Sequence, residues 1–162
     1  MEAIAYFRKQ DKLNKAGIEG YVLFEQLQKR EYTTVTINLK GFQPNSTHAI
    51  HIHEFSDFSK GCMSAGGHYN PYGKNHGNYM IHGNERHAGD LINNMISDDN
   101  GNVQLFFKDN LVSLYDPHSI VGRSVIIHEG VDDLGLGGNE QSLITGNAGG
   151  RMACAAIQYH LT

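Results

Sequence analysis

Residues 33–40 read Thr33-Thr34-Val35-Thr36-Ile37-Asn38-Leu39-Lys40 and alternate apolar with polar side chains. Successive side chains of a strand point to opposite faces, so this pattern predicts an antiparallel strand with one face buried. Segments of the same period recur along the chain between turn residues, whereas helical periodicity is hard to find. The expected strands cover residues 3–9, 18–25, 33–40, 48–54, 90–97, 103–108, 123–129 and 152–161.

Eight short strands without intervening helices predict an all-β fold, an eight-stranded antiparallel Greek-key barrel or sandwich. Residues 98–102 separate two of these strands and contain Asn-Gly, which reaches positive φ at low cost, so a hairpin turn is expected there. Residues 55–89 and 130–150 are glycine-rich and lack alternation. Loops of that length in a compact domain are usually functional. No linker or repeat divides the chain, and a single domain is expected over residues 1–162.

The composition excludes several classes of protein. Of 162 residues, 40% are hydrophobic and 19% charged, as in a folded chain. A net charge of −4 argues against binding to a nucleic-acid backbone. No apolar run approaches the roughly 20 residues of a membrane helix. Residues 1–9 lack the basic and apolar regions of a secretory signal. A cytoplasmic protein that binds neither nucleic acid nor membranes is therefore expected.

The chain contains 10 histidines, and their spacing points to metal chemistry. Ile50-His51-Ile52-His53 places two imidazoles on one face of a strand, about 6.6–6.8 Å apart along it, where both can reach one ion. An isolated His-x-His would equally fit two surface histidines. Further candidates follow it at His68, His76, His87, Asp90 and His128. Six imidazoles and a carboxylate exceed one closed site and divide into a nitrogen-rich site suited to copper and a mixed site suited to zinc.

Five segments carry a resemblance to a known family. They are HAIHIHEF from His48, GCMSAGGHYNP from Gly61, ERHAGDL from Glu85, VIIHEGVDDLGLGGNE from Val125 and TGNAGGRMAC from Thr145. In order and approximate spacing the chain resembles the copper/zinc superoxide dismutases over nearly its whole length. The resemblance implies an immunoglobulin-like Greek-key sandwich with two long functional loops. It also implies an enzyme that converts superoxide to dioxygen and hydrogen peroxide.

The resemblance divides the ligands between two metals. It implies that copper is bound by His51, His53, His68 and His128, and zinc by His68, His76, His87 and Asp90. His68 would then be a shared imidazolate that also relays a proton. Dismutation needs a metal that cycles by one electron, which copper does and zinc does not.

Further roles follow from the same resemblance. Asp132 would accept hydrogen bonds from the outer nitrogens of His51 and His76, although a turn residue in the loop is the alternative. Cys62 and Cys154 would form a disulfide, whereas two cytosolic cysteines are ordinarily free thiols. Closing so long a loop removes roughly 4–5 kcal/mol of unfolded-state entropy in the simple model. Arg151 would guide the anion beside copper, because its guanidinium stays charged; a surface arginine is the alternative.

The remaining histidines are assigned other roles. His48 is expected to be structural, and His118 and His160 to be surface or packing residues. The spacing from His76 to His87 is about two residues longer than is common in the family, so His82 is an alternative zinc ligand to His76.

Two departures from the family concern charge and assembly. Gly130 and Ile144 stand where many relatives carry lysines, and Gln141 replaces a common glutamate. Residues 130–150 contain no Lys or Arg, so weaker electrostatic steering of superoxide than in typical relatives is expected. Ser56 replaces a usual glycine near the family's dimer contact, which would include Phe55, Val121, Gly122 and Tyr159. A homodimer is expected.

The resemblance leaves two other functions open. A dismutase-like domain can deliver copper to the enzyme as a partner, and a zinc-only homologue can lack catalysis. Delivery domains typically have an incomplete catalytic set or an extra metal-binding domain. A copper chaperone is an expected partner of an enzyme in this family.

Overall fold

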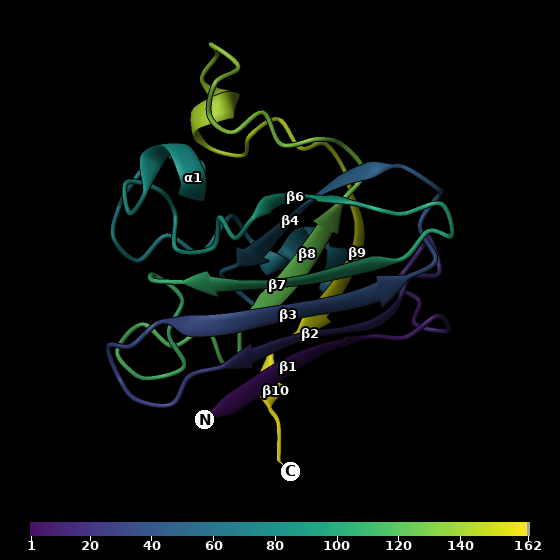
Figure 1. The fold of residues 1–162 in the computed structure, drawn as a ribbon. Coiled ribbons are helices and arrows are strands. Elements are labelled where there is room, and N and C mark those ends of the chain that lie inside the picture. The colour runs from purple at the N-terminus through teal and green to yellow at the C-terminus, as the bar shows by residue number, and fades with distance from the viewer. Residues whose placement is uncertain (162) are drawn as a thin grey trace.

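The alternating segment at residues 33–40 forms strand β3 (Thr33–Lys40), in which Thr33, Val35, Ile37 and Leu39 are buried and the intervening residues are more accessible. The computed structural model describes residues 1–161. Within them two antiparallel sheets pack face to face (Figure 1). The first has the order β10-β1-β2-β3-β7 and the second the order β6-β4-β8-β9.

The strands of the first sheet are β1 (Glu2–Phe7), β2 (Glu19–Glu25), β3, β7 (Val103–Asp109) and β10 (Gln158–Tyr159). The second sheet consists of β4 (Thr47–His53), β6 (Asn93–Ile96), β8 (Ser124–His128) and β9 (Arg151–Ala156). The loops contain four short elements. They are the strand β5 (Ser59–Cys62), the α-helix α1 (Tyr79–His82) and the 3-10 helices η1 (Met63–Ala65) and η2 (Gln141–Leu143). The all-β sandwich is confirmed.

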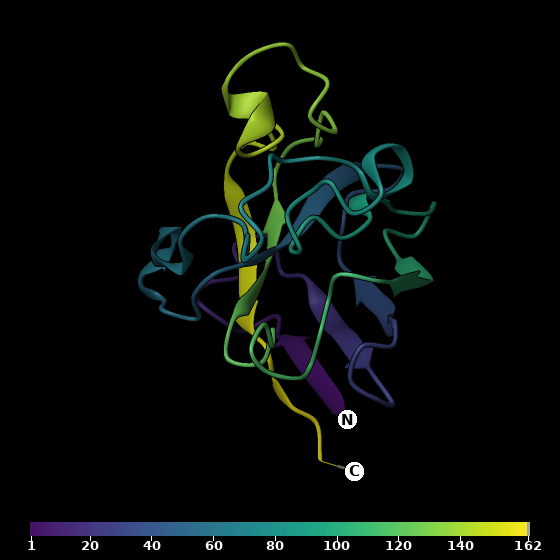
Figure 2. The same cartoon turned by 90° about the vertical axis from the view of Figure 1, so that its left-hand side faces the viewer.

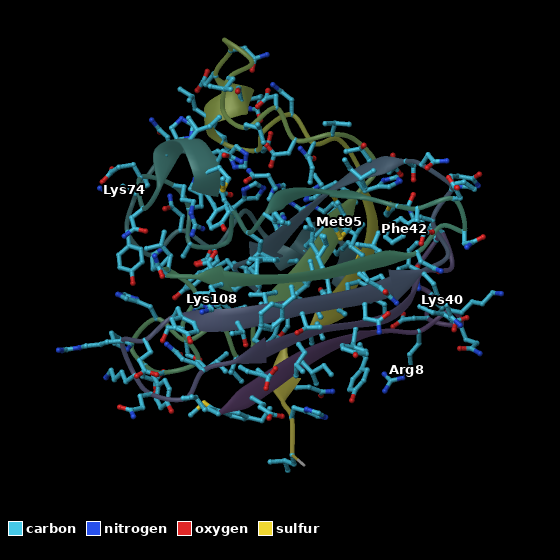
Figure 3. All side chains as sticks on the ribbon, in the orientation of Figure 1. Arg8, Lys40, Phe42, Lys74, Met95 and Lys108 are labelled. Carbon is cyan, nitrogen blue, oxygen red and sulfur yellow. A yellow bond between two sulfur atoms is a disulfide. The ribbon has the colours of Figure 1, made fainter. Side chains whose placement is uncertain are left out.

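The core lies between the two sheets, where the apolar faces of the strands meet. Phe24 and Ile37 contribute to it from the first sheet, and Ile50, Met95 and Ile127 from the second. Figure 3 labels Met95 among these interior side chains. Alternate residues of a strand face opposite ways. The residues that follow Ile50 and Ile127 in the chain, His51 and His128, therefore point out of the sandwich. The second sheet therefore presents His51, His53 and His128 on its outer face, under the long loops.

Three local expectations are wrong. Residues 98–102 do turn, with Gly101 at φ 78°, but the strands they join pair in different sheets, so the connection is no hairpin. The strand expected over residues 90–97 begins only at Asn93, because the Asp90 carboxylate is bound by loop groups. The final strand divides at buried Ile157: β9 belongs to the second sheet and β10 to the first.

Figure 2 shows the loop that carries η2 projecting beyond one end of the second sheet, whereas part of the first long loop lies along the side of the molecule. The first loop is attached to β4 by backbone bonds: Ile52 N donates to Gly89 O at 2.9 Å, and Tyr69 N donates to Ile52 O at 2.8 Å. A Cβ on Gly89 would lie 2.2 Å from Ile52 O, so only glycine allows this approach. Across the described chain, 1–161, no helix has the length and apolarity to cross a membrane.

Candidate metal centre

Strands β4 and β8 bring together histidines that are 75 residues apart in the sequence. His53 Nε2 and His128 Nε2 lie 3.3 Å apart, and both rings are buried. The rings of His51 and His68 lie with their centroids 3.9 Å apart. One nitrogen from each of His51, His53, His68 and His128 lies within 4.8 Å of the others. Four imidazoles thus face a common point on the outer face of the second sheet.

A second cluster, with a carboxylate at its centre, adjoins the first. Asp90 Oδ1 lies 2.9 Å from His68 Nδ1, 2.9 Å from His76 Nδ1 and 3.3 Å from His87 Nδ1. His68 Nδ1 and His87 Nδ1 are 3.2 Å apart. A tetrahedral zinc ion with bonds of about 2.0–2.1 Å holds its ligand atoms about 3.3 Å apart. The distances among Asp90, His68 and His87, and from Asp90 to His76, are close to that value. The donor atoms that all lie within 4.8 Å of one another on this side belong to His51, His68, His76 and Asp90.

His68 belongs to both clusters. Its Nδ1 faces Asp90, whereas its Nε2 is buried without a hydrogen-bond partner. His51 Nδ1 is the other buried side-chain nitrogen or oxygen without a partner among residues 1–161. A buried polar atom left unpaired costs free energy, and native structures rarely keep one without reason. Both unpaired nitrogens belong to the four-imidazole cluster, as expected of atoms that bind a metal ion.

Asp132 joins the outer sides of the two clusters. Its Oδ2 lies 2.6 Å from His51 Nε2, and its Oδ1 lies 2.8 Å from His76 Nε2. Histidine ligands commonly donate their second N–H to a carboxylate, which fixes the ring and its tautomer. The turn that carries Asp132 also needs Gly146, since a Cβ there would lie 2.4 Å from Asp132 Oδ1. The backbone of the second loop is thus closely packed against this carboxylate.

Sequence reasoning missed the residues that hold Asp132. Asn93 Nδ2 donates to Asp132 Oδ2 at 3.1 Å, and Asn94 Nδ2 donates to the Asp132 carbonyl at 3.0 Å. In return Asp132 N donates to Asn94 Oδ1 at 2.8 Å. Asparagine is depleted in strands, so two in succession at the start of β6 were an available signal of a local polar role.

A buried ion pair also escaped the sequence analysis. Arg86 Nη2 donates to Asp109 Oδ2 at 3.0 Å, and both side chains are almost fully buried. Arg86 also donates to the carbonyls of His87 and Asp90. The pair therefore attaches the loop that carries the carboxylate cluster to the end of β7.

Burial determines the charge of the imidazole cluster. Desolvation lowers the pKa of His51, His53 and His68, and brings the pKa of His128 down to about 4. These rings are neutral at pH 7 and keep a lone pair available for a metal ion. Burial opposes ionisation of Asp90, but hydrogen bonds with His68, His76 and His87 outweigh it and hold the pKa of Asp90 well below its usual value.

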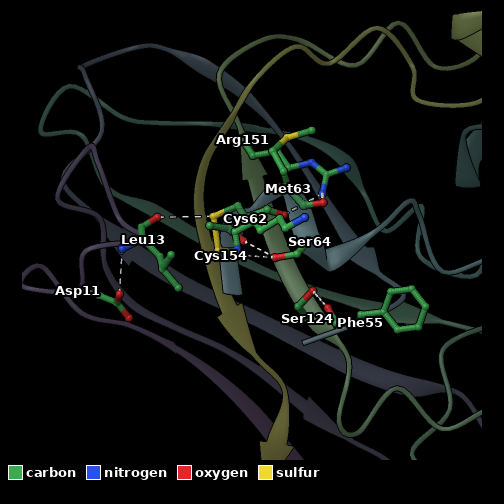
Figure 4. The surroundings of a disulfide bond; sticks show 11 residues. Asp11, Leu13, Phe55, Cys62, Met63, Ser64, Ser124, Arg151 and Cys154 are labelled. Carbon is green, nitrogen blue, oxygen red and sulfur yellow. Dashed lines mark hydrogen bonds between the residues drawn. A yellow bond between two sulfur atoms is a disulfide. The ribbon is translucent and has the colours of Figure 1, made fainter. Parts of the chain in front are cut away.

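The disulfide and Arg151 lie beside this cluster. Cys62 and Cys154 form a disulfide with a Cα–Cα distance of 5.8 Å, which confirms the expected pairing. Arg151 pairs across the sheet with His128, and its Nη1 donates to the Cys62 carbonyl at 2.8 Å (Figure 4). A hollow of about 460 Å³ opens there, lined by Arg151 together with His53, His68 and His128.

The other four histidines lie outside the two clusters. His48 Nδ1 contacts the His128 carbonyl at 3.0 Å, and His160 contacts Glu2 at 3.1 Å. His118 packs edge-on against Tyr72. His82 Nδ1 accepts a hydrogen bond from Asn78 N at 2.8 Å, within the turn of α1. The longer loop thus uses His82 for its own folding.

Comparison with known proteins agrees with this geometry. The family model described as copper/zinc superoxide dismutase matches residues 18–157. A relative named superoxide dismutase [Cu-Zn] from Saccharomyces cerevisiae is 50% identical over 142 residues, 88% of this chain and 90% of its own. One of the same name from Candida glabrata is 46% identical over 157 residues, 97% of each chain.

The chain belongs to the copper/zinc superoxide dismutase family. As a member it offers two donor sets that suit copper and zinc. Four neutral imidazoles suit copper in either of its oxidation states. The three imidazoles of His68, His76 and His87 around the Asp90 carboxylate are the donor types of a closed zinc site. The adjoining positions of the two sets make His68 the residue through which one metal would influence the other.

Zinc binding to the metal-free superoxide dismutase chain is expected to release about one proton at pH 7.5. Burial opposes the charged ring of His76, but hydrogen bonds to Asp132 and Asp90 outweigh it and raise the pKa to about 9. The ring therefore holds a proton on Nδ1 that a zinc ion bound to this atom would have to displace. Calorimetric titrations in two buffers of different ionisation enthalpy measure the release. In Asp132→Asn the pKa of His76 should fall and the release shrink; a release unaffected by this change would contradict the expectation.

Proposed function

We propose that this chain is a superoxide dismutase whose copper ligands are His51, His53, His68 and His128. Its zinc ligands would be His68, His76, His87 and Asp90. Two superoxide anions and two protons give one dioxygen and one hydrogen peroxide. The observation that carries the proposal is that His68 has Nδ1 in the carboxylate cluster and the unpaired Nε2 in the imidazole cluster. When bound, copper supplies the one-electron cycle and zinc, without redox chemistry, supplies charge and geometry.

His68 is the residue placed to move a proton. His68 lines the hollow, and its buried Nε2 has no competing hydrogen bond, whereas its Nδ1 is directed at Asp90. A proton on Nε2 can therefore be exchanged with an anion in the hollow while Nδ1 keeps the ring oriented. Asp132 supports this role indirectly, since it fixes His51 and His76, whose rings both lie next to the His68 ring.

Arg151 is the residue placed to bind the anion. Its Nη1 is fixed by the Cys62 carbonyl, and its side chain lines the same hollow as His53, His68 and His128. A guanidinium remains charged at any physiological pH and presents several donors in a rigid plane. An anion entering the hollow therefore meets one fixed cation next to the imidazole cluster.

The two alternative functions have no observation in their favour. Copper delivery and zinc-only binding would each be supported by a ligand position without a donor side chain, and all seven positions hold histidine or aspartate. Metal analysis of the purified protein, followed by a dismutation assay after zinc and copper are added, tests the proposal. We expect one of each metal per chain and rapid loss of superoxide. Two bound metals without dismutation would refute it.

We also propose that residues 1–162 form one dismutase domain and that the protein acts in the cytoplasm. In this proposal the protein is a homodimer and receives its copper from a chaperone. Phe55, Val121 and Gly122 line one surface hollow, and Phe55 and Tyr159 are about half exposed. An exposed aromatic beside such a hollow is typical of an interface. Sedimentation of Phe55→Glu against the parent chain tests the dimer: the variant should be a monomer, and an unchanged mass would contradict this assignment.

A further inference from the structure

The hollow over the imidazole cluster carries little charge of its own. Arg151 is the one lysine or arginine that lines it among residues 1–161, and no aspartate or glutamate of that range does. Residues 130–150, which form one of its walls, contain no lysine or arginine. Attraction of an anion from a distance must therefore come from another part of the surface.

A second hollow, of about 340 Å³, adjoins the first on the side of the disulfide. Met63, Gly150 and Arg151 line both hollows. Its other lining residues include three lysines and one carboxylate, namely Lys12, Lys15, Lys60 and Glu129. With Arg151 the second hollow has four positive charges against one negative charge. We call Lys12, Lys15 and Lys60 the lysine cluster.

The lysine cluster is assembled from two segments that the disulfide region holds in place. Leu13 packs with Cys62 and Cys154, and its carbonyl faces Cys62 Sγ at 3.6 Å (Figure 4). Lys15 N donates to the Met152 carbonyl at 3.2 Å. Lys60 N donates to Ser64 Oγ at 3.0 Å. The backbone under each lysine is thus fixed beside the strand that carries Arg151.

The three lysine side chains are available to an approaching anion. All three residues are exposed, and within residues 1–161 none of them forms an ion pair. Of the nearby carboxylates, Glu129 lines the hollow, whereas Asp11 Oδ1 accepts a bond from Leu13 N. The net charge of this surface therefore stays positive in a chain whose total charge is −4.

We propose that the lysine cluster attracts superoxide to Arg151 from the disulfide side of the hollow. The proposal rests on the proposed dismutase function. Electrostatic steering is already known for superoxide dismutases, and what this chain adds is the place of its cations. The expectation of weak steering considered only the charges of residues 130–150, which form one wall of the hollow over the imidazole cluster. A positive surface around a narrow opening raises the local concentration of a small anion, and added salt screens that effect.

The test compares two variants with equal changes in charge. In the first variant, glutamine replaces Lys12, Lys15 and Lys60. In the control variant, glutamine replaces Lys29, Lys40 and Lys108. Lys40 and Lys108 lie on the first sheet. Each is loaded with copper and zinc, and the second-order dismutation rate is measured from low salt to about 0.5 M. We expect the first variant to lose about three- to tenfold in rate at low salt, with a flatter salt dependence. The control should match the parent chain, and arginine at the three positions should restore the rate.

Equal rates in the two glutamine variants, or a parent rate that does not fall with salt, would overturn the proposal. A second readout avoids turnover: inorganic phosphate is titrated into the metal-free, disulfide-intact protein and followed by NMR of the backbone amides. The amides of Lys12, Lys60 and Arg151 should shift in the parent and the control, and much less in the first variant. If no variant dismutates superoxide but phosphate still binds as expected, the proposed function has failed while the anion surface stands. Absence of these phosphate shifts from the parent would count against the surface itself.

Discussion

Replacement of His128 by alanine is expected to lower dismutation at least about 100-fold while zinc remains bound. Loss of a residue that only orients a ligand typically costs 10- to 100-fold in activity or metal affinity, so loss of a ligand should cost at least as much. His128 Nε2 lies 3.3 Å from His53 Nε2, within the imidazole cluster. Its ring takes no part in the hydrogen bonds that join His68, His76, His87 and Asp90.

Metal content of the variant, measured after loading with both ions, provides the decisive comparison. The expected result is a full complement of zinc and little copper. His48→Ala is a suitable control: His48 contacts the His128 carbonyl through Nδ1 but belongs to neither cluster, so copper binding should largely survive. Equal loss of zinc and copper from His128→Ala would show that the division of ligands between the two ions is incorrect.

Replacement of Asp109 by alanine is expected to destabilise the metal-free protein by about 3–5 kcal/mol. The change leaves Arg86 buried without its carboxylate, and removal of one partner from a buried ion pair carries a cost of that size. It also removes the Oδ1 that accepts bonds from Leu111 N and Val112 N. For a protein of this length the midpoint of thermal unfolding should fall by about 6–20 °C.

The matched control is Glu19→Ala, which breaks the pair between Glu19 and Lys40. Those side chains are 38% and 66% exposed, and an exposed pair contributes about 1 kcal/mol or less. Both variants are unfolded with denaturant in the metal-free, disulfide-intact form at one protein concentration. A similar loss in both would mean that burial of Arg86 and Asp109 adds nothing. Zinc affinity should fall only in Asp109→Ala, because Arg86 also binds the carbonyls of His87 and Asp90.

The fold could be predicted from the sequence where a strand buries one face and leaves the other more accessible, as β3 does. Residues 33–40 alternate fully, and β3 has the expected bounds. The hairpin at residues 98–102 was wrong for a physical reason. The Asn-Gly conformation is local and was predicted correctly, but which strands pair depends on the packing of both sheets. The same holds for the division of the last strand at Ile157, whose burial between β9 and β10 is a tertiary property.

At the centre, histidine spacing and family resemblance identified the side chains that come together, but not what supports them. Arg86 and Asp109 are 23 residues apart and in segments with different roles, so nothing local marks them as partners. Lys12 and Lys60 likewise become neighbours of Arg151 only through the disulfide region. Asn93 and Asn94 left a weak signal, since they are unusual in a strand.

His68 and Asp132 each contact residues of both clusters. With the metal ligands proposed above, an ion in one cluster would therefore change the free energy of binding an ion in the other. An ion that orders the shared ring spares the second ion that entropic cost, which is positive cooperativity. Thermodynamic linkage makes the effect reciprocal. The factor by which bound zinc raises the affinity for copper equals the factor by which bound copper raises the affinity for zinc. Neither affinity is then a property of its own four residues, and each has a defined value only for a stated occupancy of its neighbour.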